Sequence, residues 1–147
     1  MKSYSSGYSD MKELKLILIV GPTASGKTAA SIYAATKLNG EIVSADSIQV
    51  YKGMDIGSAK PTMQERQGIP HHLMDAIDIN SPKFSVAEFR KMAGEAIEDI
   101  AGRGKQPIVV GGTGLYINSL VFPLNFTEVQ SDEKLRSELS EIEERQG

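Results

Sequence analysis

The sequence has no cysteine and no long hydrophobic run, and both absences limit what the protein can be. Without cysteine there are no disulfides and no thiolate metal ligands, which fits a reducing compartment. The longest apolar stretch is far shorter than the roughly 20 residues that a membrane-spanning helix needs. The N-terminal MKSYSSGYSD also lacks the apolar centre of a secretory signal. We therefore expect a cytoplasmic protein that does not enter a membrane, and a monomer.

Strong positive charge is also lacking. The formal net charge of the 147 residues is −3, so there is no overall electrostatic attraction to nucleic acid, and such a partner has to be argued from local features. Hydrophobic residues make up 40% of the chain, which is enough for the core of about one domain.

The most informative stretch is an apolar run that leads into a glycine-rich loop. Residues 14–20 are apolar apart from Lys15 and predict a buried central strand. The next eight residues match the phosphate-binding pattern G-x-x-x-x-G-K-[ST] between a strand and a helix, so a simple turn is the weaker reading. Lys27 is placed to contact the outer phosphates of a nucleotide such as ATP, and the Thr28 hydroxyl to ligate Mg²⁺. The predicted phosphate-binding residues are Gly21, Pro22, Thr23, Ala24, Ser25, Gly26, Lys27 and Thr28.

Helical and strand patterns alternate along the rest of the chain. Asn39 is a good helix stop, and Ser85 with Glu88 forms a capping box at a helix start. The sequence predicts strands at 41–45 and 106–110 and helices at 27–38, 86–102 and 115–121. This order predicts an α/β fold: a three-layer core with a parallel sheet around the phosphate-binding loop.

Polar residues follow two of the predicted strands. Asp46 and Gln49 come after the second strand, and a glycine turn with Thr113 comes after the third. Ligands of open parallel sheets bind beyond the carboxyl ends of the strands, so these residues should share a crevice with the phosphate-binding loop. By position alone, Asp46 could instead cap the next turn, and the glycine turn could be purely structural.

Three further segments complete the prediction. Residues 52–61 read as an extended functional loop. His71 and His72 are adjacent and would point to opposite sides of an extended segment, which disfavours a shared metal ion. Residues 131–145 form a charged helical pattern with a narrow apolar stripe that needs a partner. We expect a tag-like or disordered N-terminus at 1–13, a partial core at 14–126 and the start of a helical insertion at 127–147.

Four segments together resemble the tRNA dimethylallyltransferase (tRNA isopentenyltransferase) family. They are GPTASGKT at 21–28, SADSIQVYKGMDIGSAKPT at 44–62, GIPHHLMDAIDI at 68–79 and PIVVGGTGLYI at 107–117. The second is the most specific, and its one departure is Ser58, where the family usually has threonine. Family members are about twice as long, so we expect this chain to correspond to an N-terminal portion and not to be active alone.

The resemblance implies a reaction and roles for named residues. The family transfers a dimethylallyl group from dimethylallyl diphosphate to N6 of the adenine adjoining the anticodon of tRNA. The loop would then hold a departing diphosphate with Mg²⁺, and the catalytic residues would be Lys27, Thr113 and Asp46, the last as the base. The tRNA-binding residues would be Asp46, Ser47, Ile48, Gln49 and Thr113.

Three other functions stay open from the sequence. An adenylate isopentenyltransferase would use the same core on free AMP. A small-molecule kinase would use the loop for ATP, but it predicts a lid with clustered arginines, and the arginines here are scattered. A module that binds phosphate without turnover is the non-enzymatic alternative.

Overall fold

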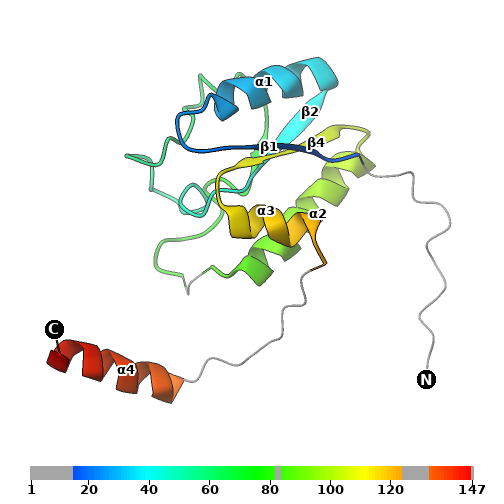
Figure 1. Cartoon of the computed structure of the whole chain (residues 1–147). Coiled ribbons are helices and arrows are strands. Elements are labelled where there is room, and N and C mark those ends of the chain that lie inside the picture. Colours follow the sequence, from blue (N-terminus) through cyan, green and yellow to red (C-terminus); the bar gives the residue numbers. More distant parts are fainter. Residues whose placement is uncertain (1–14, 82–83, 124–132, 147) are drawn as a thin grey trace, which may run out of the picture.

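The computed structural model describes residues 15–81, 84–123 and 133–146, and these contain a parallel sheet with helices on both sides (Figure 1). The described strands pair in the order β1-β4-β2-β3, all in parallel. Their bounds are Ile17–Val20 for β1, Gly40–Ser44 for β2, His71–His72 for β3 and Gln106–Gly111 for β4. The predicted α/β fold with a parallel sheet is confirmed.

Helices cover both faces of the sheet, which makes the core three layers deep. On one face, α1 (Lys27–Leu38) packs Ile32 and Ala35 against Ile42 and Ile108 of the strands. The other face is covered by α2 (Val86–Gly102) and α3 (Gly114–Val121). These two helices meet through Phe89 of α2 and Tyr116 of α3, whose rings stack with centroids 4.1 Å apart. Each apolar helix face is therefore buried against strand residues.

The helix ends agree with the signals in the sequence. Asn39 ends α1 in the left-handed conformation, with φ of 50°. Ser85 begins α2 with a complete capping box, in which its side chain accepts the N–H of Glu88 while the Glu88 carboxylate accepts the N–H of Ser85. Both devices satisfy backbone groups that the helix itself leaves unpaired.

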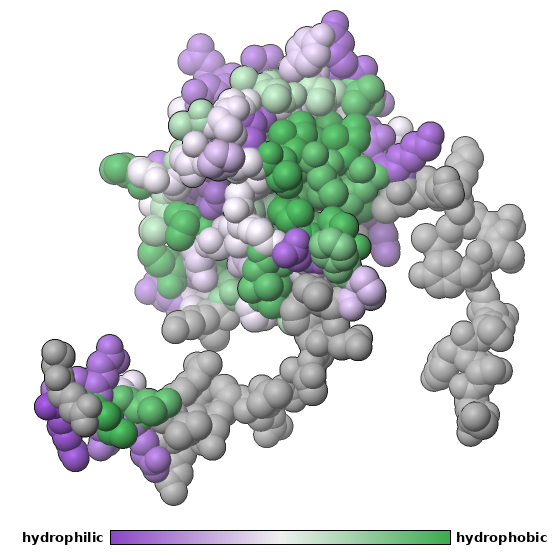
Figure 2. Space-filling view, viewed as in Figure 1, coloured by the Kyte–Doolittle hydropathy of each residue, from purple (hydrophilic) through white to green (hydrophobic). Residues whose placement is uncertain are grey.

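The prediction that the first strand is buried and central is wrong. In the described sheet β1 is an edge strand with β4 as its one neighbour, and Leu18 and Val20 are 36% and 56% exposed. Their side chains point to the face that α2 and α3 cover, but these helices do not reach over them. Apolar side chains accordingly gather on the surface over β1 and α3 (Figure 2).

The short strand β3 was not predicted. His71 and His72 pair in parallel with Ile42 and Val43 of β2 and so extend the sheet by one strand. Two adjacent histidines show no apolar alternation, so only the pairing with β2 reveals the strand.

The final described helix is α4 (Glu133–Gln146), close to the predicted 131–145. Its apolar residues Leu139 and Ile142 are 56% and 49% exposed. No helix in the described ranges is both long and apolar enough to cross a membrane. The prediction for residues 1–13 lies outside the described residues.

Candidate functional site

The glycine-rich loop joins the end of β1 to the start of α1. Ala24 and Gly26 both take positive φ angles, 64° and 83°, which bend the chain tightly before the helix. Gly26 is the N-cap and supplies no side-chain hydrogen bond, and the first turn of α1 has no acidic residue. The first N–H groups of α1 are thus left for an anion, with the favourable end of the helix dipole behind them. The Lys27 ammonium lies over the same loop and donates to the Pro22 carbonyl at 2.6 Å.

Asp46, Ser47 and Thr113 come together just beyond the carboxyl ends of β2 and β4. The Asp46 carboxylate accepts two backbone N–H groups through Oδ1, from Ile48 at 2.9 Å and from Gln49 at 3.2 Å. The Ser47 N–H donates to the Thr113 hydroxyl at 3.0 Å, and this hydroxyl donates to Ser47 Oγ at 3.3 Å. Asp46 therefore caps the following turn with one oxygen, while the two segments are tied through Thr113.

Gly111 allows the two strand ends to approach so closely. A Cβ atom at this position would lie 2.2 Å from the Ala45 carbonyl oxygen, which is well inside contact distance. The same carbonyl accepts the N–H of Thr113 at 3.3 Å. A side chain at position 111 would push the Thr113 turn away from Asp46, so glycine is required by space.

A cavity of about 820 Å³ opens between the phosphate-binding loop, the end of β2 and the segment 58–61. Residues 23–28 of the loop line it, together with Asp46 and Gln49. Ile32 and Tyr33 extend it along the flank of α1. Thr113 does not line this cavity, which differs from the predicted crevice shared with the loop. Ser47 does not line it either, nor does Ile48, which is 45% exposed.

Gln49 has a structural task that the sequence did not suggest. Its side-chain amide nitrogen donates to the carbonyls of Ser58 at 3.0 Å and Ala59 at 3.3 Å, and its amide oxygen accepts from the Ser44 hydroxyl at 3.3 Å. Gln49 thus fixes the segment 58–61 against the end of β2. The predicted contact between Gln49 and a nucleic acid base stays a prediction.

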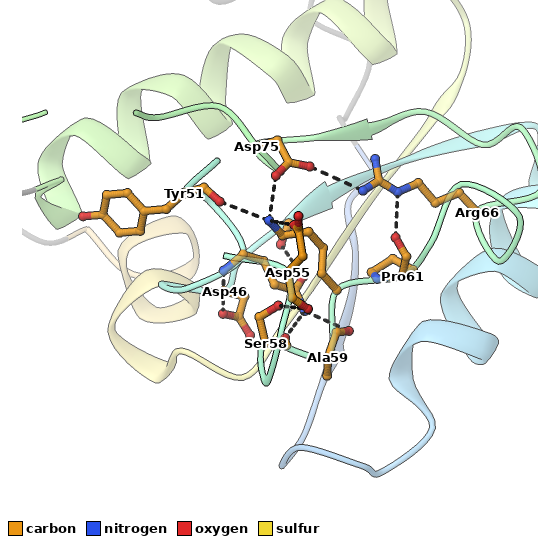
Figure 3. A network of polar contacts seen from close by, with 11 residues as sticks. Asp46, Tyr51, Asp55, Ser58, Ala59, Pro61, Arg66 and Asp75 are labelled. Carbon is orange, nitrogen blue, oxygen red and sulfur yellow. Dashed lines mark hydrogen bonds and ion pairs between the residues drawn. The ribbon is translucent and has the colours of Figure 1, made fainter. Parts of the chain in front are cut away.

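The loop 52–61 is held from its other side by a charged cluster that sequence reasoning missed (Figure 3). We call it the Lys60 cluster; its members are Tyr51, Asp55, Lys60, Arg66 and Asp75. The Lys60 ammonium contacts the Asp75 and Asp55 carboxylates at 2.6 and 2.9 Å and donates to the Tyr51 carbonyl at 3.0 Å. Asp75 comes from a turn 15 positions later, so no local spacing could have indicated this contact.

A second charged cluster lies at the opposite end of the sheet, around the buried Glu41 of β2. Its carboxylate accepts two hydrogen bonds from Arg103, at 2.6 and 2.7 Å, and one each from Lys105 and His72, at 2.7 Å. The bonds from Arg103 hold the pKa of Glu41 well below its usual range although burial opposes this, and Lys105 and His72 add to the effect. This cluster supports the strands and lies away from the cavity.

The histidines do not form a metal site. His72 pairs with Glu41, whereas His71 contacts the Ile69 carbonyl through Nδ1 at 2.8 Å. Burial lowers the pKa of His71. In the part of the chain that the structure describes, no group of three His, Cys, Asp or Glu side chains could hold an ion. A Mg²⁺ ion bound through phosphates needs fewer protein ligands, and the Thr28 hydroxyl of the cavity fits its preference for oxygen.

Comparisons with known proteins agree on one family. The sequence model described as IPP transferase matches residues 49–147, which is more than half of the chain. The chain is 50% identical over 134 residues to a tRNA dimethylallyltransferase of Caldanaerobacter subterraneus, covering 91% of this chain and 42% of the relative. It is 54% identical to the protein of that name from an Exiguobacterium species, covering 93% and 44%.

Solved structures give the same result. The fold matches a full-length tRNA isopentenylpyrophosphate transferase from Bacillus halodurans with a TM-score of 0.76 and 49% identity, over 88% of this chain and 43% of that one. It matches a tRNA delta(2)-isopentenylpyrophosphate transferase from Staphylococcus epidermidis with a TM-score of 0.72 and 52% identity, over 88% and 41%. The chain thus spans about two fifths of the length of the relatives it matches. By sequence and by fold, it belongs to the IPP transferase family.

Proposed function

We propose that this chain supplies the donor-binding and acid–base part of a tRNA dimethylallyltransferase. The reaction would transfer a dimethylallyl group from dimethylallyl diphosphate to N6 of the adenine adjoining the anticodon in tRNA. A new bond forms between N6 and the allylic carbon, the bond from that carbon to the diphosphate oxygen breaks, and N6 loses a proton. The names of the relatives support transfer of a dimethylallyl group to tRNA, and the position of the acceptor follows from the family resemblance.

The phosphate-binding loop suits the departing diphosphate. Its backbone N–H groups and the start of α1 attract phosphate oxygens whatever group the phosphate carries. Lys27 leaves the Pro22 carbonyl at little cost, because this contact is exposed, and is then free to neutralise charge on the leaving group. The Thr28 hydroxyl would ligate Mg²⁺, which stabilises the same developing charge when bound.

Asp46 suits the role of the base that accepts the N6 proton. Its Oδ1 atom accepts two backbone N–H groups, which orient the carboxylate, and Oδ2 has no hydrogen-bond partner among the described residues. Asp46 can therefore cap the turn through Oδ1 and accept the N6 proton through Oδ2. The single observation that carries the proposal is that Asp46 lines the same cavity as Lys27 and Thr28.

A direct comparison of ligands tests the proposal. Titration calorimetry with Mg²⁺ would measure the binding of dimethylallyl diphosphate and of ATP to the 147-residue chain. We expect dimethylallyl diphosphate to bind about tenfold more tightly or better. Asp46→Asn should leave this affinity nearly unchanged, because the base acts on the acceptor.

Tighter binding of ATP would contradict the proposal and favour a kinase. Discrimination between the two prenyl acceptors needs a further assay. Transfer to AMP with none to an anticodon stem-loop would favour an adenylate isopentenyltransferase.

A further inference from the structure

Lys60 is the most enclosed cation of the described loops, and the proposed chemistry does not use it. Only 4% of its side chain is exposed. Its ammonium can donate three hydrogen bonds, and all three go to the Lys60 cluster, to Asp75, Asp55 and the Tyr51 carbonyl. Burying a charged ammonium is unfavourable unless partners of opposite charge and hydrogen-bond acceptors surround it. Removing the positive charge of Lys60 would leave these partners without this counter-charge, so the arrangement depends on that charge.

The Lys60 cluster joins the cavity loop to a turn far along the chain. Asp75 lies between the Lys60 ammonium and the Arg66 guanidinium, which is 3.5 Å from its second oxygen (Figure 3). Arg66 also donates to the Pro61 carbonyl at 3.0 Å. Burial alone would lower the pKa of Lys60, but hydrogen bonds and charges from Asp75 and Asp55 outweigh it and raise the pKa. The carboxylates of Asp75 and Asp55 thus favour the charged form of the ammonium.

The segment that these contacts hold is one wall of the cavity. Residues 58–61 line the cavity opposite the phosphate-binding loop. Gln49 binds the carbonyls of Ser58 and Ala59 from the side of the cavity, and the Lys60 cluster fixes the next residues from behind. Ala59 between them has φ of 51°, a left-handed conformation that is unfavourable for residues other than glycine and persists only when neighbours impose it.

We propose that Lys60 is a positioning residue whose enclosed charge holds residues 58–61 as the cavity wall, and so sets the fit of the ligand portion beyond the diphosphate. The identity of that ligand rests on the proposed function. The proposed diphosphate site is the loop at residues 21–28, which has no hydrogen bond or ion pair with the Lys60 cluster among the described residues. Loss of the Lys60 charge should therefore weaken discrimination between ligands and spare phosphate binding.

The test compares two substitutions in the same loop. Lys60→Met keeps the length of the side chain and removes the charge. Lys52→Met removes the same charge from an exposed position with no side-chain ion pair in the described structure, and serves as the matched control. For each chain, calorimetry with Mg²⁺ measures the affinities for inorganic diphosphate and for dimethylallyl diphosphate. A thermal melt reports whether the chain is folded.

We expect Lys60→Met to reduce the preference for dimethylallyl diphosphate over inorganic diphosphate about tenfold, with the affinity for inorganic diphosphate within about twofold of the unaltered chain. Lys52→Met should change neither affinity. An unchanged preference in Lys60→Met would overturn the inference. Equal loss of both affinities together with unfolding would also overturn it, since Lys60 would then be needed for the fold as a whole.

Failure of the proposed function would look different. In that case the unaltered chain would show no preference for dimethylallyl diphosphate. Backbone hydrogen exchange then tests the positioning role. The N–H of Lys52 donates to the Ile77 carbonyl and the N–H of Asp75 donates to the Gln49 carbonyl, so the exchange rates of these amides report how firmly the loop and the turn are held. Faster exchange at these amides in Lys60→Met than in Lys52→Met would uphold the role of the charge in holding the wall. Equal rates would overturn it.

Discussion

Removing the charge of Glu41 should destabilise the protein without touching the cavity. In Glu41→Gln the side chain keeps its shape, but one carboxylate oxygen becomes an NH₂ group that faces donors. Four hydrogen bonds now reach this carboxylate, from Arg103, Lys105 and His72, and its side chain is 3% exposed. Breaking a buried ion pair costs about 3–5 kcal/mol. We expect about 2–3 kcal/mol here, because Arg103 and Lys105 are 40% and 34% exposed and can turn to water.

The assay is thermal unfolding followed by circular dichroism. For a chain of this size, about 2–3 kcal/mol corresponds to a drop in melting temperature of about 5–10 °C. Glu98→Gln is the control, since Glu98 is an exposed carboxylate on α2. A melting temperature of Glu41→Gln within about 2 °C of the unaltered chain at pH 7 would refute the reasoning.

The pH dependence gives an independent check. The pKa of Glu41 in the folded chain is lowered from its ordinary value of 4.5, chiefly by Arg103. Folding therefore gains stability from Glu41 above pH 4.5, and this gain is lost as the pH falls toward the lowered pKa. The difference between the unaltered chain and Glu41→Gln should shrink as the pH falls below 4.5. A difference that stays constant into strong acid would contradict the assignment of the shift to Glu41.

Three further predictions concern the site. Lys27→Met should weaken the binding of inorganic diphosphate, measured by calorimetry, about 10- to 100-fold, because a charge-assisted contact is lost. Lys37→Met is the control and should leave this affinity unchanged. Equal effects of the two substitutions would contradict the role of Lys27. Thr113→Val removes the acceptor of the Ser47 N–H and should lower the free energy of unfolding, measured by urea titration, by about 1–2 kcal/mol. Thr113→Ser keeps the hydroxyl and should have nearly the stability of the unaltered chain. If Thr113→Ser is as unstable as Thr113→Val, the hydroxyl is not the cause. Gly111→Ala places a Cβ 2.2 Å from a carbonyl oxygen and should cost about 3 kcal/mol or prevent folding, so an unchanged melting temperature would refute the steric argument.

Local signals predicted the helices well. The ends of α1 and α2 depend on Asn39 and on the pair Ser85 and Glu88, whose hydrogen bonds involve residues within four positions along the chain. The sheet was harder, because the order of strands depends on contacts between distant segments. An apolar run such as β1 has the same pattern whether it lies in the centre or at an edge, so its edge position could not be read from the residues.

The sequence indicated residues that line the site, but not the hydrogen bonds and ion pairs between them. The glycine-rich loop and Asp46 were singled out from motifs, and both line the same cavity. Their roles in binding and catalysis stay predictions. The capping bonds of Asp46 and its proposed role as a base could not be separated from sequence, since aspartate is suited to both. The Lys60 cluster was missed because its ion pair joins residues of a loop and a turn whose spacing has no period.

The position of two acidic residues on and just after β2 affects which substitutions the protein can tolerate. It carries Glu41 near its start, and Asp46 follows just beyond its end at Ser44. At about 3.3 Å per residue, the five steps from Glu41 to Asp46 separate their Cα atoms by up to about 16 Å. The stability of the fold can therefore be adjusted at one end of this strand without changing the proposed catalytic residue at the other end. If the proposed function holds, substitutions can change stability and turnover almost independently, because the two depend on residues at opposite ends of the strand.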